Sequence, residues 1–152
     1  MSRFVFPYGI RFQENGRVEV FPAAEILVLG RGSKGLRTLF HVDSGATTSV
    51  LSSRDALALG IDYRQGQKTL VRGFSGEALL GYRGVVALEF GRRRIKIPII
   101  FVEHDFLPRI LGREGVFPHF GVLFYEAKKK TAFLDTNKKE IRGILDKLIR
   151  EV

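Results

Sequence analysis

The segment from Leu39 to Leu51 limits most strongly what this chain can fold into. An apolar run rich in strand-forming residues delivers one carboxylate, Asp43, breaks at Gly45, and then resumes as a second apolar run. An Asp side chain in such a turn accepts hydrogen bonds from backbone N–H groups, and glycine allows positive φ. The pattern therefore predicts a carboxylate fixed at the end of a buried strand, with little side-chain freedom.

An Asp-Ser/Thr-Gly triplet by itself says little about catalysis, because average composition produces one in about one chain in fifteen of this length. Two further segments favour a functional interpretation. Residues 108–117 contain an apolar pair followed by Gly-Arg, and residues 71–77 form a glycine-flanked turn that lies between the other two segments in the sequence.

In this order, the three segments resemble those of the retropepsin-like aspartic proteases, the family of the retroviral proteases and their cellular relatives. The family signature combines an apolar-Asp-Ser/Thr-Gly-Ala loop, a flexible glycine-bearing flap and an apolar-apolar-Gly-Arg segment. These match residues 42–46, 72–76 and 110–113, and the resemblance covers roughly residues 25–135. It implies a mostly β fold, a closed barrel or sandwich.

Length and composition set the outer limits of the fold. A chain of 152 residues predicts one domain over residues 1–152, with a core at about 18–135. No apolar run approaches the ~20 residues of a membrane span, and the N-terminal residues lack the apolar region of a signal peptide. The expected location is therefore cytoplasmic. The absence of cysteine excludes disulfides and thiolate metal sites, and no metal or cofactor is expected.

The net charge of +9 has two interpretations. It is either a footprint for nucleic acid or acidic partners, or a solvated basic surface. The basic residues are dispersed along the chain, and the densest clusters, residues 92–94 and 128–130, fall where hairpin turns are expected. The solvated surface is therefore favoured, and nucleic acid is disfavoured as a partner.

Short apolar runs separated by Gly, Pro and Asn signals predict strands over most of the chain. They are expected at residues 3–21 around a turn at 14–16, at 25–29 and 36–42, and in hairpins over 67–90, 85–102 and 124–134. A short helix is expected at residues 52–60, with a serine N-cap and a glycine stop. An amphipathic helix is expected at 137–151, because apolar residues recur there at helical spacing. It lies outside the resemblance, and its expected role is packing or dimer contact.

Aspartic protease chemistry needs two carboxylates that share one proton. This chain has one Asp-Ser-Gly, and the next candidate, Asp135, is followed by Thr136-Asn137, with Asn where the turn needs Gly. We therefore reject Asp135 as the second acid. The remaining solution, which the family uses, is a homodimer with one Asp43 from each chain across a two-fold axis, acting on a polypeptide substrate.

The resemblance also assigns the supporting roles. It assigns catalysis to Asp43, the active-site loop to Ser44, Gly45, Ala46 and Thr47, the flap and substrate contacts to Arg72, Gly73, Phe74, Ser75 and Gly76, and structural support to Ile110, Leu111, Gly112 and Arg113. In many retroviral members the arginine pairs with an acid at the position of Thr47. Arg113 is therefore expected to contact Glu114, another acid or backbone carbonyls. Ala46 lacks the hydroxyl that would lower the pKa of the outer carboxylate oxygen, which predicts a less acidic optimum.

Two functions remain open from the sequence. The leading one is an aspartic endopeptidase that works as a homodimer through a water activated by the two acids. The second is a catalytically silent binding module with the same fold, which binds nucleic acid or acidic partners through its positive surface. Retention of the complete loop from Asp43 to Ala46 favours the enzyme, because a binding module needs no exposed acid there.

Overall fold

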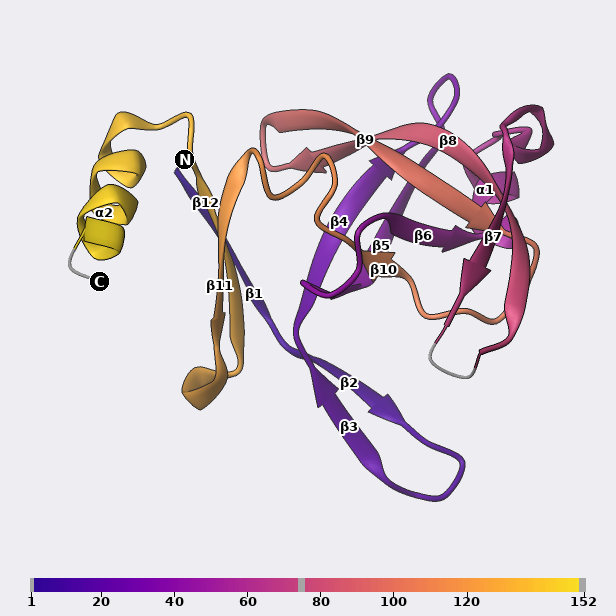
Figure 1. The fold of residues 1–152 in the computed structure, drawn as a ribbon, viewed down its shortest axis with the longest axis horizontal. Coiled ribbons are helices and arrows are strands. Elements are labelled where there is room, and N and C mark those ends of the chain that lie inside the picture. Colours follow the sequence, from indigo (N-terminus) through magenta and orange to yellow (C-terminus); the bar gives the residue numbers. More distant parts are fainter. Residues whose placement is uncertain (1, 74–75, 151–152) are drawn as a thin grey trace.

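A seven-stranded sheet with the order β4-β5-β10-β6-β9-β8-β7 forms most of the protein in the computed structural model, which describes residues 2–73 and 76–150 (Figure 1). Its strands are β4 (Ala23–Leu29), β5 (Gly35–Val42), β6 (Ser49–Ser52), β7 (Lys68–Arg72), β8 (Ala78–Phe90), β9 (Arg93–Val102) and β10 (Ile110–Leu111). Because β4 also pairs with the far end of β8, the sheet closes on itself, and β7 lies outside this ring on the first residues of β8. The mostly β fold expected from the sequence is confirmed.

Alternating side chains of the strands fill the closed sheet. In β4 the buried residues include Ile26 and Val28, and in β5 they include Phe40 and Val42. This spacing of two follows from the strand geometry, in which successive side chains point to opposite faces. β5 therefore leads into the loop of Asp43 with its last residue, Val42, buried in the core.

A second sheet of three strands, in the order β1-β12-β11, joins the two ends of the chain. Its strands are β1 (Arg3–Pro7), β11 (Phe120–Tyr125) and β12 (Lys130–Asp135). Phe90 at the end of β8 packs against this sheet, with ring centroids 4.7 Å from Phe120 and 5.2 Å from Phe133. The two sheets therefore share one apolar core. The hairpin expected at 124–134 is present and begins earlier, at Phe120.

The two expected helices are present with shorter bounds. α1 (Ser53–Ala58) has the predicted serine N-cap, Ser52, and ends before Gly60, which has a φ of 67°. α2 (Lys139–Arg150) begins later than the predicted residue 137, and its expected last residue, 151, lies outside the described residues. None of the helices in the described part of the chain is long and apolar enough to cross a membrane.

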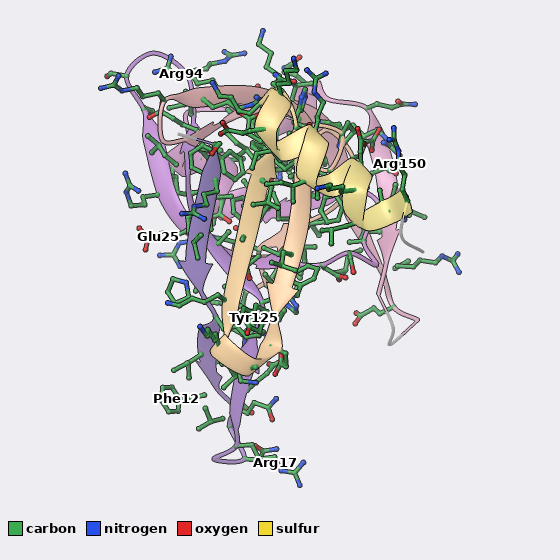
Figure 2. The ribbon with its side chains drawn as sticks, turned by 90° about the vertical axis from the view of Figure 1, so that its left-hand side faces the viewer. Phe12, Arg17, Glu25, Arg94, Tyr125 and Arg150 are labelled. Carbon is green, nitrogen blue, oxygen red and sulfur yellow. The ribbon has the colours of Figure 1, made fainter. Side chains whose placement is uncertain are left out.

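The strands β2 (Gly9–Phe12) and β3 (Val18–Phe21) form a two-stranded ribbon that projects from the body, as both views show (Figures 1 and 2). The ribbon turns at the Asn15-Gly16 signal expected from the sequence, where Gly16 has a φ of 77°. The basic residues 92–94 and 128–130 also lie at or beside hairpin turns, as predicted. Short 3-10 turns at Tyr63–Gln65 and Glu126–Lys128 were not predicted.

Candidate active site

Asp43 follows the last residue of β5 directly. Its backbone N–H donates to the Leu111 carbonyl at 3.0 Å, and the N–H of Val42 donates to the Pro22 carbonyl at 2.9 Å. The side chain is half-buried. The position of this carboxylate is therefore fixed from two sides, by β10 and by the residue that precedes β4.

The loop after Asp43 holds one of the carboxylate oxygens. The N–H of Gly45 donates to Asp43 Oδ1 at 2.9 Å, and the N–H of Ala46 donates to the Asp43 carbonyl at 3.2 Å. This is the Asp turn that the sequence predicts. Ser44 and Thr47 are exposed.

β10 lies between the two strands that enter and leave this loop. Ile110 pairs with His41 in parallel on β5 and with Val50 in antiparallel on β6. The N–H of Gly112 then donates to Ser49 Oγ at 3.0 Å. The structure therefore places the apolar-apolar-Gly segment directly beside the loop of Asp43, as the family resemblance predicts.

Arg113 corrects one expectation from the sequence. Its guanidinium donates to the Thr47 hydroxyl at 3.4 Å, and none of the ion pairs within residues 2–73 and 76–150 includes it. Glu114, the acid proposed for it, instead accepts a hydrogen bond from the Thr48 hydroxyl at 3.1 Å. Arg113 thus contacts Thr47, the position that holds an acid in many retroviral members. Glu114, the residue after Arg113, binds Thr48, the residue after Thr47. Both side chains bind the loop from outside.

Sequence reasoning missed the pair of Asp55 and Arg109. Arg109 immediately precedes β10 and donates to both carboxylate oxygens of the buried Asp55, at 3.1 and 2.9 Å. Asp55 is also the third residue of α1 and closes its capping box, because Ser52 and Asp55 exchange hydrogen bonds. The Ser-x-x-Asp pattern was a usable signal for the cap, but nothing local indicates a partner so far along the chain.

The hairpin expected to serve as a flap is formed by β7 and β8. Arg72 pairs with Ala78 at the end of the ladder, and the N–H of Gly76 donates to the Gly73 carbonyl at 3.0 Å. Arg72, Gly73 and Gly76 are exposed. The two other predicted flap residues, Phe74 and Ser75, lie outside the described residues.

Asp135, which the sequence analysis rejects as the second catalytic acid, is buried and forms an ion pair. It is 3% exposed and pairs with Arg93 at the start of β9. Its Oδ1 also accepts the N–H of Asn137 at 3.0 Å, ahead of α2. Asp135 is therefore bound within the junction of the two sheets. His41 packs against Phe21, with ring centroids 5.0 Å apart.

Comparison with known proteins identifies the family. The sequence model described as "aspartyl protease" matches residues 32–114, more than half of the chain, so the protein belongs to the aspartyl protease family. The matched range contains the loop of Asp43, the β7–β8 hairpin and the Gly112-Arg113 segment. The protein is thus an aspartic peptidase.

Similarity to a solved structure supports the retropepsin-like fold. A retropepsin-like aspartic protease from Rickettsia conorii is 18% identical, has a TM-score of 0.58, and covers 87% of this chain and 98% of its own. The EIAV protease complexed with the inhibitor HBY-793 is 26% identical, has a TM-score of 0.46, and covers 61% of this chain and 82% of its own. A search of curated protein sequences finds no significant match.

Proposed function

We propose that this aspartic peptidase is a homodimeric endopeptidase in which the Asp43 side chains of two copies form the catalytic pair. The observation that carries the proposal is the geometry of Asp43. It stands at the end of β5, half-exposed, with its backbone fixed by Leu111 and its Oδ1 bound by the Gly45 N–H. The sequence contains one Asp-Ser-Gly triplet, so a second acid in an equivalent loop has to come from another copy.

Two such carboxyls share one proton, because like charges about 3 Å apart cannot both ionise. The ionised acid takes a proton from water, which attacks the scissile carbonyl, and the protonated acid donates a hydrogen bond to the carbonyl oxygen. A two-fold axis places identical residues opposite each other, so one gene supplies both acids. We assign Ser44 the contact that holds the two loops together, and Gly45 the close approach to the substrate backbone.

The β7–β8 hairpin is the proposed flap. Its strands end at exposed residues, Arg72 and Ala78, and glycines at positions 73 and 76 flank its tip. A peptide bound beneath it would form backbone hydrogen bonds as an added strand, with alternate side chains in pockets. Closure of the hairpin would exclude water other than the nucleophile. Ile110, Leu111, Gly112 and Arg113 are proposed to hold the loop from the opposite side.

The test compares peptide cleavage by the wild type and Asp43→Asn between about pH 3 and 8. The account predicts that Asp43→Asn loses at least about 1,000-fold in kcat with its fold intact. Asp146→Asn, the same change at an exposed position of α2, is expected to keep full activity. Equal activity of the wild type and Asp43→Asn would contradict the proposal and favour the binding module.

A further inference from the structure

The ribbon formed by β2 and β3 has two chemically different faces. The cross-strand pairs Gly9–Phe21 and Arg11–Glu19 alternate with the pairs Ile10–Val20 and Phe12–Val18. Because side chains on a strand alternate between faces, the first two pairs share one face and the last two share the other. We call the face of Ile10, Phe12, Val18 and Val20 the apolar face of the arm.

The polar face is satisfied within the chain. Arg11 forms an ion pair with Glu19 at 3.3 Å, and its guanidinium lies 5.0 Å from the centroid of the Phe21 ring. Phe21 is 6% exposed and packs against His41 of β5. Gly9 makes room for this ring, because a Cβ there would lie 2.5 Å from it. The base of the arm, the β2–β3 ribbon, is therefore packed against β5, the strand that leads to Asp43.

The apolar face has no such partner among residues 2–73 and 76–150. Its members are exposed to 60% (Ile10), 80% (Phe12), 55% (Val18) and 48% (Val20). The ribbon extends away from the body with Phe12 near its far end (Figure 2). A two-stranded ribbon is marginally stable in water unless it packs on something, so a contiguous apolar face of this kind indicates a contact surface.

Two observations identify what covers this face. The first is position: β3 continues through Pro22 into β4, and the Pro22 carbonyl binds the N–H of Val42, the residue before Asp43. If the catalytic pair forms from two copies, the second chain must lie at this end of β5, where the arm begins. The second is charge: each copy carries a net charge of +9, so two copies repel each other. Contact between them is therefore favoured at an uncharged, apolar surface such as this face.

We infer that the apolar face of the β2–β3 arm packs on a second copy of this chain and contributes to the dimer that assembles the catalytic pair. This inference rests on the proposed function, because its choice of occupant uses the two-fold position of Asp43. It assigns a role to residues 9–21, which precede the segment that matches the aspartyl protease family. In this inference the arm affects catalysis only by stabilising the dimer, and it does not contact the substrate.

The test replaces one cross-strand pair on each face. Phe12→Thr with Val18→Thr removes apolar surface while keeping strand-forming residues. Arg11→Gln with Glu19→Gln is the matched control on the polar face and leaves the net charge unchanged. Sedimentation velocity over a range of concentrations gives the dimer dissociation constant, and circular dichroism checks that each variant folds.

The inference predicts that the apolar-face variant raises the dimer dissociation constant by about 100-fold or more. Its specific activity would recover at high protein concentration, while the control matches the wild type. Unchanged dimerisation of the apolar-face variant would overturn the inference and leave the catalytic pair intact. A dimeric variant with a raised KM would overturn it in favour of a substrate-binding face. A wild type that is monomeric while active would instead overturn the proposed function.

A second measurement needs no substitution. Hydrogen exchange of residues 9–21 in the wild type is followed above and below the concentration at which dimers dissociate. Packing on a second copy predicts slower exchange of the arm in the dimer, whereas exchange that is independent of concentration would overturn the inference.

Discussion

At Gly112, a Cβ would lie 2.7 Å from the carbonyl carbon of Thr48 and 2.9 Å from the carbonyl oxygens of Thr47 and Thr48. All three are backbone atoms of Thr47 and Thr48, which connect the loop of Asp43 to β6. They cannot yield without moving the loop that carries Asp43. The glycine of the apolar-apolar-Gly-Arg segment is therefore required by close packing beneath the site.

Gly112→Ala is expected to lower the free energy of unfolding by about 2 kcal/mol, because overpacking displaces backbone. It is also expected to reduce kcat, since the displaced segment continues into the loop of Asp43. Urea denaturation and peptide cleavage measure the two effects. Gly143→Ala is the control: nothing lies within 4 Å of its added Cβ, and alanine there favours the helix by up to about 1 kcal/mol. Wild-type stability in Gly112→Ala would contradict the packing argument.

Opposing effects act on the pKa of the buried Asp55. Burial by itself raises its pKa, but the hydrogen bonds and charge of Arg109, together with hydrogen bonds to Ser52, outweigh it and hold the pKa below the ordinary value of 3.8. A carboxyl with a lowered pKa in the folded state stabilises the fold above the unfolded pKa. This stabilisation is lost as the pH falls through the folded pKa.

Asp55→Asn is therefore expected to cost about 2 kcal/mol near neutral pH, less than a fully buried pair because Arg109 is 39% exposed. The difference from the wild type should shrink progressively as the pH falls below 3.8. Thermal or urea unfolding at several pH values measures it. The exposed Asp62→Asn serves as the control and should stay within about 0.5 kcal/mol of the wild type. A difference that is constant down to about pH 2 would refute the ionic role.

Among the elements, α2 has an amphipathic sequence, but most of its apolar side chains are exposed. Of its apolar residues, Ile141 is 7% exposed, whereas Ile144, Leu148 and Ile149 are 55%, 60% and 73% exposed. Leu145 contacts the sheet at Gly121, where an added Cβ would lie 2.9 Å from its Cδ1. The helix is thus attached mainly through its first turns.

Ile141→Ala is expected to destabilise the protein by about 2–3 kcal/mol, the usual cost of truncating a buried isoleucine. Ile144→Ala, one turn along the same helix, should change stability by no more than about 0.5 kcal/mol. Chemical denaturation of both variants gives the comparison. Equal costs would mean that the apolar face of α2 is buried to the same depth along its length.

The sequence predicted the strands and helices well because their signals are local. The cap at Ser52, the glycine turn at Asn15-Gly16 and the alternation of β4 and β5 all depend on neighbouring residues. The later start of α2 reflects Asp135, whose oxygens bind the N–H groups of Asn137 and Lys138 before the helix begins. Such a contact depends on the sheet and is not visible in the helix pattern.

At the scale of the whole molecule, the sequence predicted that residues 110–113 approach the loop of Asp43 but not how they hold it. The family resemblance placed Ile110 to Arg113 beside the loop, and the structure has them there. It could not predict that Arg113 contacts the Thr47 hydroxyl, or that Arg109 pairs with Asp55. These contacts join residues far apart in the sequence, and they follow from the position of β10 between β5 and β6.

The central claim, that two copies share one site, is tested most directly by mixing wild type with Asp43→Asn at constant total concentration and allowing subunits to exchange. If each site needs Asp43 from both chains, activity follows the square of the wild-type fraction. An equal mixture then retains about one quarter of the activity. If one chain carries a complete site, the same mixture retains about one half, and that result would contradict the account.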